Sequence, residues 1–301
     1  MIALTRILVP HDFGATSAAA MRYAAALTRM FGAALDVLHV GDPKDAINAS
    51  DGVGTTPLHQ LMTLSDEAGE ATALHFRFGT PRDEIVRFAQ ERRTDLIIMG
   101  THGRGRIGHA VVGSVAEGVV RAAPCPVMVV RDPSHEFVVP NILVATDFDR
   151  ASATALTYAK ELGWVFGGRL HLLHVAENWF LKPVVWDPHA LEASKRQQLS
   201  DQFTDQERNA LHAKTVLLLA DDPAAAIIDY ANSSAIDLIV IGTHGRSSID
   251  RLLMGSVAER VIRRAPCSVL AVRHPEREFV SAEPAEVHAP SCLGTRSVES
   301  S

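Results

Sequence analysis

The same sequence module occurs twice in this chain, and this internal repeat restricts the fold more than any other feature. Gly100 to Arg131 aligns without a gap on Gly242 to Arg273, and 19 of the 32 positions are identical. The opening Arg6-Ile-Leu-Val-Pro-His-Asp12 matches Asn141-Ile-Leu-Val-Ala-Thr-Asp147 in the same way. A repeated unit of about 135–140 residues has the size of an ordinary domain. The repeat therefore predicts two domains of the same fold.

The limits of the two domains follow from where the repeat breaks. We predict domain 1 over residues 1–136 and domain 2 over residues 137–275, joined at the short polar stretch Asp132-Pro-Ser-His-Glu136. Because the join is short, we expect the domains to pack against each other. Residues 276–301 are polar, contain Pro284 and Pro290 and show no periodicity, so we predict a mostly disordered tail.

Short apolar segments alternate with helical segments within each module. In module one the pattern predicts strands at Arg6–Pro10, Ala34–Val40, Ala73–Phe78, Asp95–Met99 and Pro126–Val130. It predicts helices at Thr16–Phe31, about Pro57–Gly69, Pro81–Arg92 and Ser114–Ala122. We expect Thr16 or Ser17 to cap the first helix and Gly32 to end it. Module two is expected to have one longer second helix between Pro188 and Lys214. This alternation is typical of the α/β class, in which helices cover both faces of a parallel sheet.

A glycine-rich segment follows the fourth strand of each module. It reads Gly100-Thr-His-Gly103, nine residues, then Gly113-Ser114, and it recurs as Gly242-Thr-His-Gly245, nine residues, then Gly255-Ser256. Parallel α/β sheets bind ligands at the carboxyl ends of their strands, where glycines let backbone N–H groups approach an anion. The Gly-Ser pairs also begin helices, whose N-terminal dipole favours phosphate. The alternative is that the glycines only form tight turns.

Charged residues near these loops are candidates for the same sites. Arg104 and Arg106 supply cations in the first loop, and Arg246 and Arg251 do so in the second. Asp12 and Asp147 end the first strands of their modules. There they either cap the following helix or contact the base, ribose or metal ion of a nucleotide.

Histidines also recur at equivalent positions in the two modules. His39 and His174 lie in the second strands, where they are either metal ligands or general bases, or else buried and hydrogen-bonded side chains. His102 and His244 lie in the glycine loops and fit phosphate contacts better than catalysis.

Module two departs from module one at one turn. Asp221-Asp222-Pro223 stands where module one has Gly79-Thr-Pro81. Glycine permits a positive φ and a close backbone approach, whereas aspartate adds negative charge. If this turn lies near an anionic ligand, the second site should bind it more weakly.

Composition and charge exclude several classes of protein. The formal net charge of −6 argues against non-specific binding to nucleic acid or to an acidic membrane. The three cysteines form no CxxC pair, so they indicate neither a disulfide framework nor a zinc site. No apolar stretch reaches the ~18–20 residues of a membrane span. The N-terminus also lacks the features of a signal peptide, so we expect a cytoplasmic protein.

These residues resemble the universal stress protein family in its tandem, ATP-binding form. The family motif of Gly, two residues, Gly, nine residues and Gly-Ser/Thr is complete in both modules. The resemblance extends to the Leu-His-Val strands at residues 38–40 and 173–175 and covers nearly the whole chain apart from the tail. It implies two tandem Rossmann-like domains of the adenine nucleotide alpha hydrolase type, each with a five-stranded parallel sheet in the order 3-2-1-4-5. It also implies that the last strands pair, either within the chain or between two chains of a homodimer.

The resemblance further implies an adenine nucleotide in each module, namely ATP with or without Mg²⁺. In the first site, adenine would contact Pro10, Asp12 and Val40. The phosphates would contact Gly100, Thr101, His102, Gly103, Arg104, Gly105, Arg106, Gly113, Ser114 and Val115. The second site would use Ala145, Asp147, Val175, Gly242, Thr243, His244, Gly245, Arg246, Ser247, Ser248, Gly255, Ser256 and Val257. In that family the complete motif accompanies ATP binding.

Three functions from different classes compete. The motif favours an ATP-binding sensor or regulator in the stress response. The alternative is an enzyme, such as a slow ATPase or a phosphotransfer catalyst. The chain has no Walker-type GxxxxGK[ST], no Lys in either glycine loop and no obvious general base beside it, so no catalytic residue is assigned. A nucleotide-free interaction module would show substitutions in the glycine motif, and both copies are intact.

Overall fold

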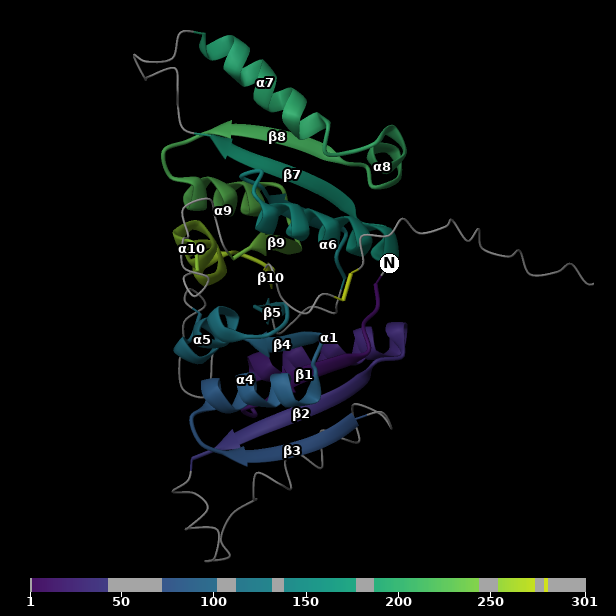
Figure 1. The fold of residues 1–301 in the computed structure, drawn as a ribbon, viewed down its shortest axis with the longest axis vertical. Coiled ribbons are helices and arrows are strands. Elements are labelled where there is room, and N and C mark those ends of the chain that lie inside the picture. The colour runs from purple at the N-terminus through teal and green to yellow at the C-terminus, as the bar shows by residue number, and fades with distance from the viewer. Residues whose placement is uncertain are drawn as a thin grey trace, which may run out of the picture.

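The computed structural model describes residues 2–42, 72–101, 112–131, 138–176, 187–243, 254–273 and 279–280. The described strands form one ten-stranded sheet in the order β3-β2-β1-β4-β5-β10-β9-β6-β7-β8 (Figure 1). Neighbouring strands inside each module are parallel. Each half of the sheet therefore has the order 3-2-1-4-5. This order confirms the predicted α/β fold with two tandem Rossmann-like halves.

Strands and helices alternate in both modules as the apolar pattern predicts. In module one the described elements are β1 (Arg6–Pro10), α1 (Ala15–Phe31), β2 (Ala34–Gly41), β3 (Thr72–Phe78), α4 (Pro81–Arg92), β4 (Leu96–Gly100), α5 (Ser114–Ala122) and β5 (Val127–Val130). In module two they are β6 (Asn141–Ala145), α6 (Arg150–Phe166), β7 (Arg169–Ala176), α7 (Pro188–Ser200), α8 (Asp205–Ala210), β8 (Lys214–Leu219), α9 (Pro223–Ser233), β9 (Leu238–Gly242), α10 (Ser256–Arg264) and β10 (Ser268–Val272).

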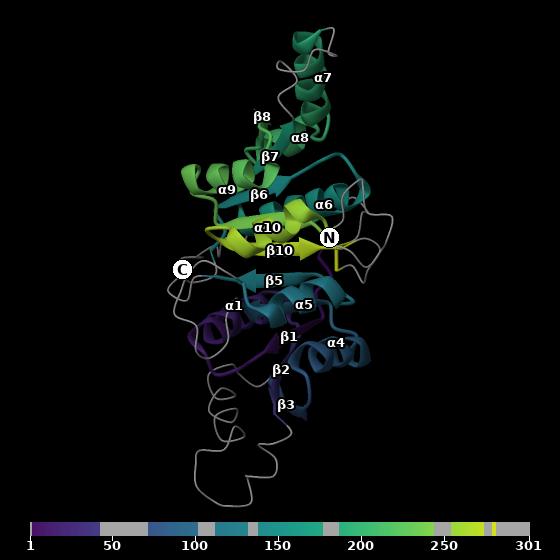
Figure 2. The same cartoon turned by 90° about the vertical axis from the view of Figure 1, so that its left-hand side faces the viewer.

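The two modules join through their last strands. β5 and β10 pair antiparallel, with Val129 opposite Val269 and Met128 opposite Leu270. Figure 2 shows the two strands side by side in the middle of the sheet. The pairing of last strands that the resemblance implies therefore occurs within this one chain.

Helices cover both faces of the sheet and bury two layers of apolar side chains. On one face, α1 and α6 contribute fully buried alanines such as Ala20 and Ala155, and these small side chains let the helices lie close to the strands. On the other face, α4, α5, α9 and α10 contribute larger side chains such as Ile85 and Ile262. Because the central strands are covered on both faces, their sequences are continuous apolar runs. No helix in the described part of the chain combines the length and the apolar character that a membrane span needs.

Two helices differ from their predicted form. The predicted long helix of module two is two helices, α7 and α8, because Thr204 and Glu207 form a capping box that starts a new helix. α1 begins after Gly14, and neither Thr16 nor Ser17 is its N-cap. Its predicted end is correct, since Gly32 adopts a left-handed φ of 66°. The predicted helix at residues 57–69 lies outside the described residues.

A short segment near the C-terminus packs against the start of the chain. Phe279 and Val280 are both buried, and Val280 forms an antiparallel bridge with Ile2. The backbone N–H of Phe279 donates a 3.1 Å hydrogen bond to the hydroxyl of the fully buried Tyr158. The predicted disordered tail therefore does not describe these two residues. Residues 276–278 and 281–301 lie outside the described part of the chain.

Charged side chains of α5 and α10 meet across the junction between the modules. Glu117 on α5 pairs with Arg263 on α10 at 2.7 Å, and the equivalent Glu259 pairs with Arg121 at 3.6 Å. The two pairs are related by the internal repeat, so the junction is approximately symmetric.

A buried carboxylate, Asp36 in β2, lies between β1, β3 and α4. It accepts hydrogen bonds from Arg6 at 2.9 Å, from His75 at 2.8 Å and from Arg92 at 3.3 Å. Burial by itself raises the pKa of Asp36, but these three hydrogen bonds lower it overall.

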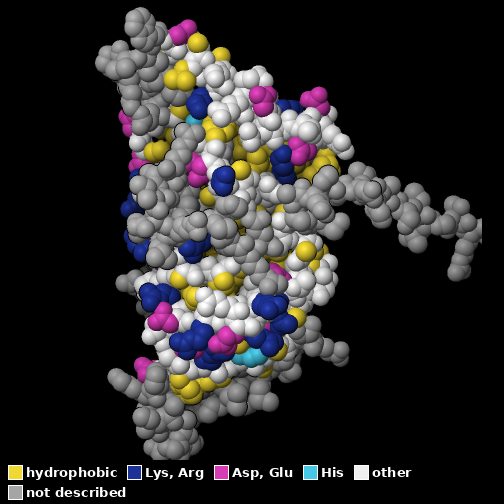
Figure 3. Space-filling model, viewed as in Figure 1, with side chains coloured by type: hydrophobic (Ala, Val, Ile, Leu, Met, Phe, Trp, Pro, Cys, Tyr) yellow, Lys and Arg dark blue, Asp and Glu magenta, His cyan; other side chains and the backbone are white. Residues whose placement is uncertain are grey.

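The surface of the molecule on the side drawn in Figure 3 is mixed in charge. Basic and acidic side chains lie next to each other over the lower half of that view.

Candidate functional site

Each module has a cavity at the carboxyl ends of its strands. The first cavity has a volume of about 490 Å³ and the second about 310 Å³. Both lie where the first and fourth strands of the module end, which are β1 and β4 in one case and β6 and β9 in the other. The connections from these two strands leave in opposite directions, and open α/β sheets bind their ligands at such a switch point.

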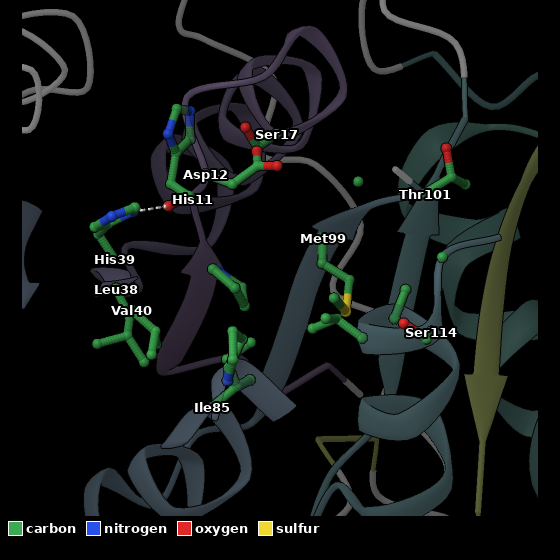
Figure 4. Close-up of a pocket in the computed structure, with 16 residues that line it drawn as sticks. His11, Asp12, Ser17, Leu38, His39, Val40, Ile85, Met99, Thr101 and Ser114 are labelled. Atoms are coloured by element: carbon green, nitrogen blue, oxygen red, sulfur yellow. Dashed lines mark hydrogen bonds between the residues drawn. The ribbon is translucent and has the colours of Figure 1, made fainter. Parts of the chain in front are cut away.

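The structure brings most of the predicted residues together in these cavities. Those that line the first cavity are Pro10, Asp12, Val40, Gly100, Thr101, Gly113, Ser114 and Val115 (Figure 4). Those that line the second are Ala145, Asp147, Val175, Gly242, Gly255, Ser256 and Val257. Thr243 is buried beside the second cavity, where its carbonyl oxygen accepts a 2.7 Å hydrogen bond from Gly255. The predicted loop residues His102, Gly103, Arg104, Gly105, Arg106, His244, Gly245, Arg246, Ser247 and Ser248 lie outside the described residues.

Several other lining residues were not among the predicted nucleotide contacts, although His39 was considered as a metal ligand, a general base or a structural side chain. In the first cavity they are His11, Ser17, Leu38, His39, Pro81, Ile85, Met99 and Ala116, and in the second Thr146, Ser152, Leu173, Pro223, Ile227, Ile241 and Ala258. Most of the apolar ones follow the strand or helix pattern, which assigns them to the core. One sequence signal could have found the residues of α4 and α9. Each helix starts with a proline, and this proline places the first turn of the helix at the edge of the sheet where the cavity lies.

The turn after the first strand has an unusual backbone that module two repeats. Phe13 and Phe148 have φ values of 63° and 65°, a region that costs a residue with a side chain about 1–2 kcal/mol. The amide of Phe13 donates to Nδ1 of His11 at 3.1 Å. The amide of Phe148 donates to Oγ1 of Thr146 at 3.0 Å. Strain that persists in both modules at a cavity indicates a functional constraint on this turn.

The strained turn carries Asp12 and Asp147. Oδ1 of Asp12 accepts a 3.0 Å hydrogen bond from the amide of Gly14, and Oδ1 of Asp147 accepts a 3.3 Å bond from the amide of Asp149. Gly14 and Asp149 are the N-cap residues of α1 and α6, so neither Asp12 nor Asp147 is a helix cap. The two aspartates stabilise the turn instead, and both line a cavity.

The strand histidines are tied to this same turn. Nδ1 of His39 lies 2.7 Å from the carbonyl oxygen of His11, and Nδ1 of His174 lies 2.7 Å from that of Thr146. A carbonyl oxygen can only accept, so Nδ1 carries the proton in both residues. The rings of His39 and His174 also contact Phe13 and Phe148, with centroids 4.6 Å apart in both pairs. This arrangement supports the interpretation of His39 and His174 as hydrogen-bonded structural side chains.

The N-terminal ends of α5 and α10 open onto the cavities. Their N-cap residues, Gly113 and Gly255, have extended backbones and no side chain that caps the helix. The amide of Gly113 donates to the carbonyl oxygen of Thr101 at 2.7 Å, and Gly255 repeats the bond with Thr243. Because no side chain caps the first-turn amides, this end of each cavity suits a phosphate.

The first glycine of each motif has a packing role. A Cβ added to Gly100 would lie 2.7 Å from the backbone carbonyl carbon of Thr16, and one added to Gly242 would lie 2.7 Å from that of Ala151. Real Cβ atoms do not approach backbone this closely. The start of α1 or α6 therefore lies directly against the end of β4 or β9. The prediction gave ligand approach as the reason for Gly100, and the structure adds this tighter constraint.

The turn before α4 differs from its counterpart before α9. Gly79 has a φ of 142°, which favours glycine, whereas the equivalent Asp221 does not adopt a positive φ. Asp222 is the N-cap of α9 and accepts from the amide of Ala225 at 3.1 Å. It also forms a two-bond ion pair with Arg260 on α10, and these hydrogen bonds lower the pKa of Asp222.

A family of known proteins matches both modules. The model of the universal stress protein family matches residues 3–131 and 139–273. A universal stress protein of Mycolicibacterium smegmatis is 24% identical over 291 residues, which cover 89% of this chain and 96% of that protein. One of Mycobacterium tuberculosis is 28% identical over 206 residues, which cover 65% of this chain and 67% of that protein.

A solved structure shows the same fold. The crystal structure of a universal stress protein from Archaeoglobus fulgidus matches with a TM-score of 0.65 and 24% identity. The match covers 90% of this chain and 98% of that chain. The two modules are thus arranged as in a known protein.

Proposed function

This chain belongs to the universal stress protein family, and from that membership we propose that its modules bind adenine nucleotides, with ATP as the principal ligand. The bound nucleotide makes the protein a nucleotide-dependent sensor or regulator in a stress response. One observation carries the proposal: the same cavity occurs twice. Each time it lies between a strained aspartate turn and the start of a helix whose N-cap is a glycine, so no side chain caps that helix.

The lining of the first cavity suits the two ends of a nucleotide. Val40 and Ile85 lie on one side of the cavity, and Thr101 and Ser114 lie on the other (Figure 4). Ligand sites are mostly apolar, with a few polar groups that fix orientation. Adenine fits against the apolar side, and Asp12, which lines the same cavity, would contact the base or ribose. The phosphates fit at the N-terminal end of α5.

A titration of the full chain with ATP tests the proposal. Val40→Trp fills the apolar part of the first cavity and Val175→Trp that of the second, so each variant should lose one site and keep the other. A tryptophan at the exposed Val165 of α6 is the matched control and should bind as wild type does. Failure of the folded wild-type chain to bind ATP at millimolar concentration would overturn the proposal.

The enzymatic alternative is slow ATP hydrolysis or phosphotransfer. The same samples decide it, because steady phosphate release that disappears in a blocked variant would assign the turnover to that cavity. A cytoplasmic location and a homodimer remain predictions.

A further inference from the structure

The end of the described chain returns to its beginning. The carbonyl oxygen of Phe279 accepts a 2.6 Å hydrogen bond from the amide of Ala3, and Val280 bridges Ile2 antiparallel. Figure 1 and Figure 2 both draw this short segment, in yellow, beside the N-terminal end. The segment follows module two, whereas Ile2 and Ala3 open module one. These contacts therefore join the two modules at a point outside the pairing of β5 with β10.

The same segment is buried against module two. The ring of Phe279 meets that of Tyr158 on α6 edge to face, with centroids 4.8 Å apart, and its amide donates to the Tyr158 hydroxyl at 3.1 Å. Phe279 and Val280 are each 3% exposed, and Tyr158 is fully buried. All three belong to the apolar cluster that also holds Met128 of β5 and Leu270 of β10. The segment thus adds to the apolar core on the face of the sheet that α1 and α6 cover.

The sequence identifies this segment as a second copy of the linker between the modules. Residues 131–138 and 273–280 are identical at five of the eight positions, and both end in Glu-Phe-Val. The first copy continues into β6, and its last valine, Val138, is 62% exposed. The equivalent Val280, which bridges Ile2, is buried. The same sequence is therefore used once to connect the modules and once to close them.

Contacts on the other face of the junction are more open to solvent. There the ion pairs between α5 and α10 join side chains such as Arg121 and Arg263, which are both 43% exposed. In the sheet itself, the described pairing of β5 with β10 covers three residues of each strand. Burial of a phenylalanine stabilises a structure more than an exposed ion pair does, so we expect Phe279 to hold the junction closed more firmly than those pairs.

The segment can leave this position without the unfolding of a helix or strand. The described contacts that hold it are the bridge to Ile2, the hydrogen bond to Tyr158 and the burial of its two side chains. Segments near a chain end that are held in this way open at a lower free-energy cost than core strands. Ile2 leads into β1, which ends at the first cavity, and α6 starts beside the second. The segment therefore links the two elements that flank the two aspartate turns.

We propose that Phe279-Val280 is a releasable clasp that holds the two modules in their paired arrangement, and that its release opens the junction between β5 and β10. The clasp acts on the arrangement of the modules, whatever ligand the cavities bind.

The test compares three lengths of the chain. A chain that ends at Glu283 keeps the clasp and lacks the rest of the tail, so it is the matched control for a chain that ends at Glu278 and lacks both. Hydrogen exchange of the amides that pair β5 with β10 measures how often the junction opens. Exchange in β2 and β7, which lie away from the junction, measures the stability of each module.

We expect the chain that ends at Glu278 to exchange the amides of β5 and β10 about tenfold faster than the full chain, with unchanged exchange in β2 and β7. The chain that ends at Glu283 should match the full chain. Tyr158→Phe keeps the ring but removes the hydrogen-bond acceptor for the Phe279 amide, so it should give a smaller increase of the same kind.

A covalent clasp gives the reverse test in a chain that keeps its full length. Ile2→Cys and Val280→Cys, made together with Cys292→Ser, place two thiols at directly bridged positions, where antiparallel strands bring side chains within reach of a disulfide. Oxidation should slow the exchange of β5 and β10 about tenfold, and reduction should restore it. Val280→Cys alone in the same background is the control that oxidation should not affect.

Two results would overturn the clasp. One is a folded chain ending at Glu278 in which β5 and β10 exchange at the rate of the full chain, or in which all strands exchange faster to the same extent. The other is an oxidised cross-link that leaves the exchange of β5 and β10 unchanged. If the chain that ends at Glu278 does not fold, the cross-link decides.

Discussion

Nδ1 of His39 lies 2.7 Å from the carbonyl oxygen of His11, so a histidine of the second strand holds the turn that follows the first. His174 and Thr146 repeat the contact at the same distance. In each module this turn carries the aspartate that lines the cavity and a phenylalanine at positive φ. The hydrogen bond therefore fixes a strained segment of backbone at the edge of the candidate site.

His39→Ala should weaken ATP binding at the first site by about tenfold, because loss of the hydrogen bond leaves a part-buried carbonyl unsatisfied and frees the turn. His39→Asn keeps a donor near the position of Nδ1 and should recover much of the affinity. Calorimetric titration of the Val175→Trp background measures both. Equal affinities for wild type and His39→Ala would contradict the role of the histidine, and His174→Ala serves as the control that should not affect this site.

Gly113→Ala should reduce nucleotide affinity at the first site without loss of stability. The φ of Gly113 is −70°, which alanine adopts readily, so the substitution does not strain the backbone. A phosphate at the start of α5 would meet that methyl group instead of open backbone. The measurement pairs an ATP titration with urea unfolding of the same variant. Wild-type affinity would show that the ligand does not approach the helix here.

Gly100→Ala should have the opposite profile, with a loss of stability of about 1–3 kcal/mol from overpacking. The added Cβ would meet the backbone of Thr16 at 2.7 Å, so α1 must shift away from β4. Urea unfolding compares this variant with Gly113→Ala. A stability equal to that of wild type would mean that α1 does not lie as close to β4 as the structure places it.

The ion pair between Glu117 and Arg263 should stabilise the module junction only weakly, because exposed ion pairs gain little over solvation of the separate charges. The arginine side chain is 43% exposed, so solvent and salt screen the interaction. A double-mutant cycle with Glu117→Gln and Arg263→Gln, measured at low and at high salt, isolates the pair. A coupling energy that does not fall with added salt would contradict an electrostatic origin.

Asp36 should make the first module sensitive to acid. Its pKa in the folded state lies below the ordinary value of 3.8, so its stabilising contribution is complete above that pH. The contribution is lost as the pH falls through the folded-state pKa. At pH 6, Asp36→Asn should cost on the order of 2 kcal/mol, because three charge-assisted bonds are weakened. The cost should shrink as the pH approaches 3 in urea-unfolding experiments, and a cost independent of pH would refute the assignment.

The repeat and the apolar pattern were sufficient to predict most of the fold. In module one, the strands and helices on each side of Gly100 match their predicted limits closely, because buried parallel strands and proline-started helices have strong local signals. The break between α7 and α8 was also readable, since Thr204-Asp-Gln-Glu207 has the pattern of a capping box. The prediction of one long helix gave that signal too little weight.

The candidate site was harder to predict in detail. The packing of Gly100 on Thr16 joins elements that are far apart in sequence, so no local pattern indicates it. Asp149 looks like an ordinary helix cap, and its pairing with Asp147 beside a cavity depends on the positive φ of Phe148. Positions such as His11 and Met99 become site residues only once the sheet brings their strand ends together.

The most direct measurement of the central claim is made on freshly purified protein. The chain is denatured, and the released small molecules are identified and counted by chromatography against adenine nucleotide standards. We predict at least one adenine nucleotide per chain, with loss of ATP from the Val40→Trp variant. A preparation that releases no nucleotide, and that does not bind ATP when it is added to the folded chain, would contradict the account.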